Sequence, residues 1–562
     1  MIGPKTEFSD NLHGEKYRTP NEDFREAMNR IAGKLATGDR FHALRGVLLN
    51  QRFLPAGRVQ ATVGTGKLTT PLNCFVSGTI GDSFTDGDDS IMAMAEQAAE
   101  TMRMGGGIGF DFSTIRPRGS LITSLNSHSS GPVSFMQIYD AVCKCVMSAG
   151  HRRGAMMAVM RIDHPDIMEF IHAKQNMHAL TSFNISVGVT DEFMHALQNG
   201  EEYTLRWNGQ AYARLDAAEV WETLMRSAWD WAEPGVLFLD TINNTNNLRY
   251  CEFIAATNPC AEQPLPAFAA CLLGSMNLPK YLAEDGTLFD FVLFEEDIRV
   301  AVRALDAVID SARYPLPQQA EYHRKTRRLG LGVTGLATAL EAMGMPYGSA
   351  EFLAFEERIL KFLTATAYRE SIEMAKEAGS FPLLDRELYL EEGTFASTLP
   401  KDIQDGIRRH GIRNSHLTSI APCGTISLCA DNVSSGIEPV FLEEVRRVIN
   451  TPNGPLRVDL VDYGKLFLGT NARTAEDVTI DEHLDVLLAA ARNVDSAVSK
   501  TLNVPEDTPW DEFQKIYIKA WEGGAKGCTT YQVGGKRFGI LEKPEDAAAC
   551  YVDPKTGKKT CD

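Results

Sequence analysis

The pattern of hydrophobic and polar positions predicts helices that alternate with short strands over most of the chain. Short apolar runs recur in the central region and cover residues 181–189, 235–240 and 417–422. Between these runs, apolar positions recur at helical spacing, for example over 217–232 and 296–312, and this spacing predicts amphipathic helices. Such alternation is typical of an α/β fold with a largely parallel sheet.

The two ends of the chain differ from this central region. Residues 20–52 have helical spacing that the segment LPAGR at 54–58 interrupts, and residues 89–104 predict a helix opened by an aspartate cap. The residues after 540 are polar and rich in lysine and aspartate, which predicts a mobile tail. We expect an N-terminal helical region over 1–58, a main domain over 59–540 and a flexible tail over 541–562.

The composition narrows the class of protein. The formal net charge is −18, which disfavours unspecific binding to nucleic acid or anionic membranes. Nucleotide binding stays open, because a local cradle of backbone N–H groups needs no overall positive charge. The sequence has no apolar signal segment and no apolar run that approaches a membrane span. We therefore expect a cytoplasmic protein with no membrane partner.

The chain contains eleven cysteines among 562 residues, which is too few for a disulfide scaffold. Free thiols are expected, most of them acting as small buried hydrophobic side chains. We expect this buried structural role for Cys143, Cys145, Cys251 and Cys429.

The segment TNPCAEQPL, which starts at residue 257, carries the most informative spacing. It places Asn258, Cys260 and Glu262 at alternate positions, and alternate side chains of an extended segment point to the same side. An amide, a thiol and a carboxylate would then project together, which is a plausible set for nucleophilic or acid–base chemistry. The alternative is a turn around Pro259 with unrelated polar residues, and the spacing leaves both possibilities open.

This segment resembles the active-site segment of ribonucleotide reductase large subunits, N-P-C-x-E-Q-P-L. Further blocks resemble the successive blocks of that family, in the family's order, and an ordered set is far more specific than one glycine-rich motif. The blocks are NCFVSGTIGDS (73–83), GGGIGFDFSTIRPRGS (105–120), SSGPVSFM (129–136), GHRRGAMMAV (150–159), HPDIMEFI (164–171), RRLGLGVTGL (327–336), APCGTISL (421–428), SSGIEPVF (434–441) and KGCTTY (526–531). The resemblance covers residues 50 to 540.

The resemblance implies a fold: a ten-stranded α/β barrel of two antiparallel-packed halves, with a central finger loop that carries Cys260. A short helical region would precede the barrel. Many large subunits begin with an ATP-binding cone, and we expect none here because few residues precede Cys74.

The resemblance also implies roles for five residues in the reduction of ribonucleotides. Cys260 would become a thiyl radical that abstracts the 3′ hydrogen of the ribose. Glu262 would accept the 3′-hydroxyl proton, and Asn258 would hydrogen-bond the substrate hydroxyls. Cys74 and Cys271 would be the dithiol that supplies two electrons and ends as a disulfide, which requires the fold to bring them close together.

The resemblance also implies roles for cysteines in the tail and for residues that contact nucleotides. Cys550 and Cys561 match tail thiols that would re-reduce the internal disulfide by exchange, and Cys528 is an alternative exchange partner or a core thiol. The residues matched to substrate binding are Asn73, Pro422, Gly424, Thr425 and Ser427. The residues matched to effector binding are Asp82, Arg116, Arg152 and Arg153, the last two in the loop that also contains His151.

The sequence favours one source for the radical. It contains no adjacent tyrosine pair, since the corresponding block reads Thr529-Thr530-Tyr531, and it contains no glycyl-radical motif. The step from Cys260 to Cys271 is similar to that of adenosylcobalamin-dependent class II members, which bind the cofactor without a protein ligand on cobalt. We therefore expect adenosylcobalamin and no metal held by protein side chains. The alternative is a radical supplied by a separate, ferritin-like metal-containing subunit.

The expected partners follow from the same resemblance. They are a ribonucleotide, deoxynucleotide or ATP specificity effectors, a thioredoxin- or glutaredoxin-like reductant and a second copy of the chain. Two other function classes stay open: a non-catalytic nucleotide-binding homologue, and a thiol hydrolase. The second lacks an obvious histidine partner for Cys260 in its own motif. The sequence leaves open whether diphosphates or triphosphates are reduced.

Overall fold

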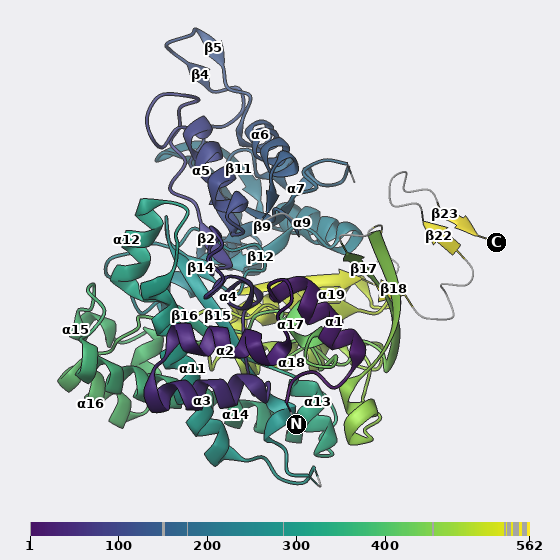
Figure 1. The fold of residues 1–562 in the computed structure, drawn as a ribbon. Helices are drawn as coiled ribbons and strands as arrows, with labels where there is room; N and C mark the ends of the chain where they lie inside the picture. Colours follow the sequence, from purple (N-terminus) through teal and green to yellow (C-terminus); the bar gives the residue numbers. More distant parts are fainter. Residues whose placement is uncertain are drawn as a thin grey trace.

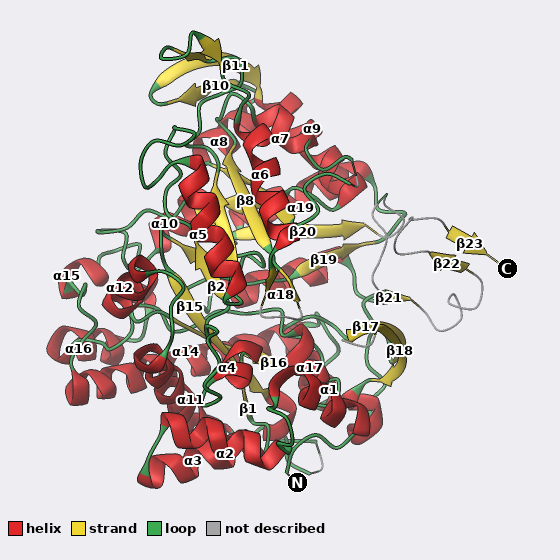
Figure 2. Cartoon of the chain, turned by 45° about the horizontal axis from the view of Figure 1, so that its top comes forward, coloured by secondary structure: helices red, strands yellow, loops and turns green. Residues whose placement is uncertain are grey.

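The structure is a computed structural model of the chain, shown in Figure 1. It describes residues 2–148, 152–176, 178–284, 286–451, 454–532, 536, 541–542, 550–552 and 559–561. Strands run through the middle of the molecule, with helices on both sides of them (Figure 2).

A large sheet organises the molecule, and its strands form two parallel groups. In the first group each strand is parallel to the next: β2 (Cys74–Val76), β3 (Gly107–Asp111), β8 (Met156–Arg161), β9 (Phe183–Val189) and β12 (Gly235–Phe238). The second group contains two parallel pairs: β15 (Ala270–Asn277) with β16 (Leu329–Thr334), and β19 (Thr501–Val504) with β20 (Gly527–Gln532). The runs predicted at 181–189 and 235–240 are therefore confirmed as strands.

The two groups run in opposite directions and meet at two antiparallel seams. β15 pairs with β2 at one seam, and β12 pairs with β20 at the other. Isolated parallel bridges join Leu331 to Thr418 and Ile420 to Val498, and they lead from β16 towards β19. The predicted fold class is confirmed as a ten-stranded mixed sheet built from two opposed halves. The bridges through Thr418 and Ile420 provide a connection that a closed barrel requires.

The N-terminal helical region consists of separate helices. The spacing over 20–52 predicted one helical stretch, but the structure has α2 (Phe24–Leu35) and α3 (Gly38–Leu49). Thr37 lies between them with extended backbone angles, which ends the first helix. Asp23 caps α2 in a reciprocal capping box with Glu26. Figure 1 shows both helices beside α11 (Phe291–Ser311).

The segment LPAGR contains a strand that the sequence pattern did not reveal. β1 (Phe53–Pro55) pairs with β15 through Leu54 and Ser275, so this segment already belongs to the large sheet. Three residues are too few to show a period of two, and the glycine and proline beside them suggested only a break.

The other predicted helices are confirmed, with one correction at a cap. α5 (Ile91–Arg103) and α9 (Ala217–Trp231) match the helical spacing, and α11 begins before the predicted start. The cap of α5 is Ser90 and not an aspartate, because the Ser90 hydroxyl accepts a hydrogen bond from Ala93 N.

The remaining elements surround this framework. The helices are α1 (Glu7–Tyr17), α4 (Gly57–Thr62), α6 (Pro132–Cys145), α7 (Ile167–His172), α8 (Asp191–Asn199), α10 (Leu239–Thr245), α12 (Pro317–Thr326), α13 (Leu336–Ala342), α14 (Ala350–Ala378), α15 (Arg386–Tyr389), α16 (Lys401–His410), α17 (Gly424–Leu428), α18 (Ile480–Ala491) and α19 (Trp510–Glu522), with short turns η1 (Leu278–Tyr281), η2 (Phe395–Thr398) and η3 (Gly464–Leu468). The small hairpins and strands are β4 (Leu121–Ile122), β5 (Ser127–His128), β6 (Met147–Ser148), β7 (Arg152–Arg153), β10 (Glu202–Trp207), β11 (Gln210–Asp216), β13 (Ala256–Thr257), β14 (Pro264–Leu265), β17 (Glu444–Thr451), β18 (Gly454–Val461), β21 (Leu541–Glu542), β22 (Cys550–Val552) and β23 (Lys559–Cys561). Among the described residues, no helix combines the length and apolar character needed to cross a bilayer.

Candidate active site

The segment that contains Cys260 is the tip of a two-stranded hairpin. β13 and β14 pair in antiparallel fashion, with Thr257 opposite Pro264. The tip closes through hydrogen bonds from Asn258 N to Gln263 O and from Gln263 N to the Asn258 side-chain oxygen. Ala261 has a positive φ of 65°, which reverses the chain within the tip.

Glycines of β3 make room for this hairpin. A Cβ atom at Gly109 would lie 1.8 Å from the carbonyl oxygen of Thr257, and one at Gly107 would lie 3.0 Å from Pro259. Only glycine at position 109 lets the two backbones come this close. The glycine-rich block at 105–109 thus has a steric role in placing the hairpin.

The hairpin tip is bound to both halves of the sheet. Asn184, in β9 of the first group, donates from its side chain to the carbonyl oxygen of Pro259 at 2.8 Å. Ala497 N, in the segment that leads to β19, donates to the carbonyl oxygen of Glu262 at 3.1 Å. These two bonds fix the tip between the halves.

Two of the predicted polar residues converge on a thiol. The Asn258 amide donates to the sulfur of Cys74 at 3.2 Å, and that sulfur lies 3.5 Å from a carboxylate oxygen of Glu262. The predicted extended segment, in which alternate side chains point to the same side, is wrong. Asn258 and Glu262 converge because the chain turns between them. Cys260 is exposed at the tip, whereas Asn258 and Glu262 are buried.

Cys74 and Cys271 are direct neighbours across the seam between β2 and β15. They are register partners in the antiparallel pairing, which places their Cα atoms about 4.5–5.5 Å apart. That separation suits a disulfide, but none of the nine cysteines whose side chains are described forms one. The predicted proximity of the two thiols is present in the structure.

Burial controls the protonation of these groups. Burial raises the pKa of Cys74 well above its ordinary value, and the nearby charges of Glu262, Cys271 and Cys260 raise it further. The pKa of Cys271 is also raised well above its ordinary value, mainly by burial. Burial likewise raises the pKa of Glu262, one of whose carboxylate oxygens has no hydrogen-bond partner. This buried oxygen is available to accept a proton from a bound molecule.

The block APCGTISL lies beside this site and begins the short helix α17. Cys423, a residue without a sequence-based role, has its sulfur 3.0 Å from the Ser275 hydroxyl of β15. Pro422 and Gly424 are exposed, and Thr425 is half-buried. Ser427 is buried and its hydroxyl binds Gly424 O and Ser435, so the open part of this loop is formed by the residues before it.

Asn73 directly precedes Cys74. Its carbonyl oxygen accepts a hydrogen bond from Gly107 N at 2.8 Å. Its side-chain oxygen is buried and has no hydrogen-bond partner. This acceptor therefore remains available beside the dithiol.

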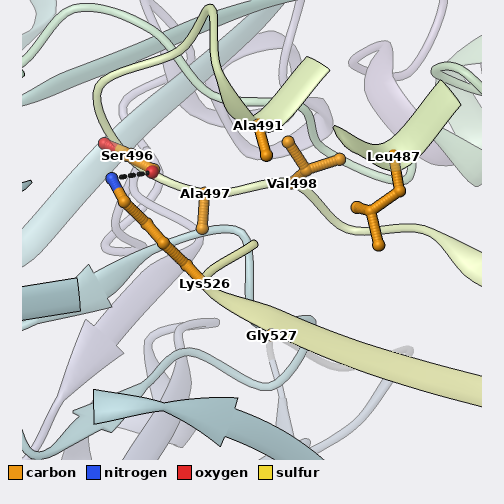
Figure 3. Close-up of a pocket in the computed structure, with 7 residues that line it drawn as sticks. All are labelled: Leu487, Ala491, Ser496, Ala497, Val498, Lys526 and Gly527. Carbon is orange, nitrogen blue, oxygen red and sulfur yellow. Dashed lines mark hydrogen bonds between the residues drawn. The ribbon is translucent and has the colours of Figure 1, made fainter. Parts of the chain in front are cut away.

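A half-buried lysine supports the segment that holds Glu262. Lys526 donates from Nζ to the carbonyl oxygens of Asp495 and Ser496, and Figure 3 shows the bond to Ser496. The adjacent Ala497 is the residue that binds Glu262 O. Burial lowers the pKa of Lys526 to about 8. The small pocket in Figure 3 lies between this segment, α18 and β20, and its volume of about 10 Å³ is too small for a nucleotide.

Asp82 and Arg116, two of the residues that the family resemblance assigns to effector binding, form an ion pair. The Asp82 carboxylate accepts from Arg116 N at 3.0 Å and from Arg116 Nε at 2.8 Å. Asp82 also lines a cavity of about 580 Å³, a size typical of small-molecule sites. The other residues lining this cavity are Ser113, Thr114, Arg161, Asp163, His164, Arg206, Trp207, Asn208 and Gly209. None of these other residues was given a site role from the sequence.

Arg152, Arg153 and the tail cysteines are described only through their backbones. Arg152 and Arg153 form β7, which pairs with β6, and His151 lies outside the described residues. Cys550 and Cys561 are register partners in the hairpin of β22 and β23. Most of the predicted mobile tail also lies outside the described residues.

The expectation for the structural cysteines is half right. Cys143 and Cys429 are buried, but Cys145 and Cys251 are exposed, so a buried role is wrong for the latter two. Both exposed residues lie at the end of an element or in a turn, where apolar spacing gives no information about burial. Cys528 is buried in β20 opposite Val236. It belongs to the β12–β20 seam, whereas Cys74 and Cys271 belong to the β2–β15 seam.

A buried dithiol next to a loop with a third thiol and a carboxylate is typical of a thiol-dependent redox enzyme. The family described as "Ribonucleotide reductase, barrel domain" matches residues 72–459 and 470–531. The chain belongs to the ribonucleotide reductase family.

Several relatives are similar over nearly the whole chain. A Mycobacterium tuberculosis protein named vitamin B12-dependent ribonucleoside-diphosphate reductase is 37% identical, over 94% of this chain and 78% of that protein. A Thermoplasma acidophilum protein of the same name is 35% identical, over 93% of this chain and 70% of that protein. The large subunit of a vaccinia virus ribonucleoside-diphosphate reductase is 25% identical, over 87% of this chain and 65% of that protein.

Proposed function

We propose that this chain reduces ribonucleotides to 2′-deoxyribonucleotides by a thiyl-radical mechanism, with the radical generated from adenosylcobalamin. The observation that carries the proposal is the convergence of Asn258 and Glu262 on Cys74, with Cys271 as its register partner. The similar proteins named vitamin B12-dependent reductases support the same reaction and favour a diphosphate substrate.

Cys260 is the residue that carries the radical. Its exposure at the hairpin tip suits contact with a large cofactor and with substrate, which the buried Cys74 and Cys271 do not offer. Adenosylcobalamin, bound at the tip, would supply the oxidising equivalent that converts the Cys260 thiol into a thiyl radical. The residues that would face it are those of the tip, Pro259 to Ala261. The sulfur of Cys260 then takes the 3′ hydrogen of the ribose.

Glu262 and Asn258 act on the hydroxyl groups of the same ribose. The unpartnered carboxylate oxygen of Glu262 accepts the 3′-hydroxyl proton, which eases loss of the 2′-hydroxyl as water. The Asn258 amide, which donates to Cys74, is placed to bind the same hydroxyls.

Cys74 and Cys271 supply the two electrons and two protons of the reduction. They become a disulfide while the ribonucleotide becomes a deoxyribonucleotide and water. The tail thiols Cys550 and Cys561, which are register partners in a hairpin, then exchange with this disulfide. A thioredoxin- or glutaredoxin-like protein reduces the tail in turn.

Nucleotide contacts complete the proposal. The loop with Pro422, Gly424 and Thr425 binds the substrate phosphates, with Ser427 fixing its shape and Asn73 facing the substrate. Specificity effectors bind near Asp82 and Arg116, beside the cavity of about 580 Å³, and the segment with Arg152 and Arg153 relays their identity. We propose a homodimer that works in the cytoplasm.

The test is an anaerobic assay of the full chain with a ribonucleoside diphosphate, a dithiol and adenosylcobalamin. We expect deoxynucleotide formation that requires the cofactor and that Cys260→Ser abolishes while nucleotide binding persists. Cys251→Ser, which changes another exposed thiol, is the matched control and should leave turnover unchanged.

Two outcomes would contradict the proposal. Turnover by Cys260→Ser would remove the radical role from that residue. Turnover only after addition of a metal-containing second subunit, and not with adenosylcobalamin, would show that the radical comes from a partner.

A further inference from the structure

Cys271 has a different chemical group beside it on each neighbouring strand. On one side its register partner is Cys74. On the other side, the parallel pairing of β15 with β16 aligns Leu272 with Leu329, so the preceding residue, Arg328, falls next to Cys271. Aligned residues of neighbouring strands point to the same face of a sheet. The dithiol and Arg328 therefore form one row across three segments.

The guanidinium group of Arg328 is fully buried and only partly bonded. Its side chain is 1% exposed, and its Nη2 donates to a carboxylate oxygen of Glu252 at 2.5 Å. Its Nε donates to His416 Nδ1 at 3.1 Å. Nη1 is buried and has no hydrogen-bond partner. A buried donor of this kind is costly, so the arrangement calls for an explanation.

The electrostatics of Cys271 agree with a role for this donor. Burial has the largest effect on the pKa of Cys271 and raises it, and the positive charge of Arg328 is the strongest influence that lowers it. The carboxylates of Glu262 and Asp495 act in the opposite direction. Arg328 is thus the main positive charge that favours a thiolate at Cys271.

We propose that Arg328 is a positioning residue that stabilises negative charge on the sulfur of Cys271 when the Cys74–Cys271 disulfide is reduced. This inference rests on the proposed function, which generates that disulfide in each turnover. A thiolate of the incoming dithiol attacks the sulfur of Cys74, a new S–S bond forms, and the Cys74–Cys271 bond breaks. The bonding electron pair leaves on Cys271 as a thiolate, which then takes a proton from solvent.

The second half of the exchange completes the electron balance. The other thiolate of the dithiol attacks its own partner's sulfur in the mixed disulfide, and Cys74 leaves as a thiolate that is protonated. Two electrons pass from the dithiol to the two cysteines. Because a more stable thiolate leaves faster, Arg328 makes Cys271 the first leaving group and directs attack to Cys74.

Other titratable groups near the row must be accounted for in any pH experiment. Those acting on Cys271 or Arg328 are Cys74, Glu262, Asp495, Glu252, Tyr322, His416 and Lys526. Burial lowers the pKa of His416 well below its ordinary value, so it stays neutral. Lys526, with a pKa of about 8, titrates within the pH range of the experiment. Because Lys526 is present in every variant, the comparison between variants does not depend on it.

The experiment follows reduction of the disulfide in the full chain. The disulfide is formed in two ways: by a single turnover without reductant, and by the chemical oxidant diamide. Dithiothreitol is then added at a series of pH values, samples are quenched with iodoacetamide, and the Cys74–Cys271 peptide is quantified by mass spectrometry.

The expected results depend on charge and not on fold alone. Arg328→Met combined with Glu252→Gln removes both members of the buried pair, and we expect reduction to slow on the order of tenfold, with its pH profile shifted upwards. Glu252→Gln alone leaves the guanidinium less neutralised and should shift the profile downwards. Arg328→Lys should retain most of the rate because the positive charge remains.

Arg327→Lys is the matched control. Arg327 is also a buried arginine, but it pairs with Asp306 and Asp310 on the α11 side. We expect its substitution to leave the rate and pH profile of disulfide reduction unchanged.

Each outcome decides the proposal. A folded double variant with the wild-type rate and profile would overturn it. If the double variant does not fold, an unchanged profile in Glu252→Gln would overturn it instead. Failure of the proposed function would appear separately, as absence of deoxynucleotide from the wild-type chain, while the diamide-formed disulfide would still report on Arg328.

Discussion

The two antiparallel seams that join the parallel groups of the sheet have the same geometry but different chemistry. At the β12–β20 seam, Cys528 lies opposite Val236, and burial alone raises its pKa to about 12. At the β2–β15 seam, Cys271 lies opposite Cys74, and an amide and a carboxylate from the hairpin reach the second thiol. Burial makes a cysteine inert. In the proposed function, a partner thiol and converging polar groups turn one of these seams into a reaction site.

The largest expected effect comes from removing the dithiol. Cys271→Ala should abolish sustained turnover, because no second thiol can complete the disulfide, whereas Cys528→Ala should turn over normally. The measurement is steady-state deoxynucleotide formation with a dithiol reductant. Equal losses of deoxynucleotide formation in the two variants would contradict a difference in function between the two seams.

The next effect concerns the carboxylate at the reactive seam. Glu262→Gln should lower the turnover rate by about 10²- to 10⁴-fold, the usual contribution of a general base. Burial raises the pKa of Glu262, so the wild-type rate should fall on the acid side at a higher pH than an ordinary carboxyl would give. In the variant, the turnover rate should no longer fall on the acid side. If that fall persisted, another titrating group would cause it.

The same substitution has a stability signature with a definite sign. A carboxyl whose pKa is raised on folding stabilises the protein below its unfolded pKa and loses that contribution as pH rises through the folded value. At neutral pH the buried carboxylate of Glu262 is therefore a cost. Glu262→Gln should melt at a higher temperature than the wild type at pH 7, and the difference should narrow towards about pH 4. Calorimetry at both pH values measures this.

A smaller effect is expected from displacing the hairpin that brings Asn258 and Glu262 to the β2–β15 seam. Gly109→Ala would bring a Cβ within 1.8 Å of Thr257 O, so the hairpin must shift, and a displacement near 1 Å costs on the order of 10²-fold in rate. Gly46→Ala, in α3 with open space around it, is the control and should slightly raise the melting temperature. Comparable activity of both variants would contradict the steric role of Gly109.

The smallest effect is expected at the inert seam. Cys528→Ala should lower the free energy of unfolding by about 1 kcal/mol through lost packing, with kcat and KM unchanged. Denaturant unfolding together with steady-state kinetics checks both halves of this expectation. A change in kcat would give Cys528 a part in the exchange.

The elements with clear periodicity were predictable from the sequence, and the short ones were not. The amphipathic spacing of 217–232 predicted α9 to within a residue. β1 was missed because three residues carry no period. The bridges at 417–422 depend on partners distant in sequence, so an apolar run alone does not reveal their pairing.

The site depended on the family resemblance more than on spacing. Nothing local to Cys74 or Cys271 predicts that the fold makes them register partners. Alternation suggested how Asn258 and Glu262 converge, but an alanine with positive φ within the tip does it instead. Arg328 lies in the matched block at 327–336, but an adjacent arginine pair does not say which member faces the dithiol.

The anchoring of the hairpin tip has a consequence for synthesis of the chain. Asn184 and Ala497 hold the tip from opposite halves, so a nascent chain that has not reached residue 497 lacks one of the two anchors of the tip. Cys260 is made early, but its working environment is assembled late. A truncated product that ends before residue 497 therefore carries Cys260 without the backbone contact that holds Glu262 beside it.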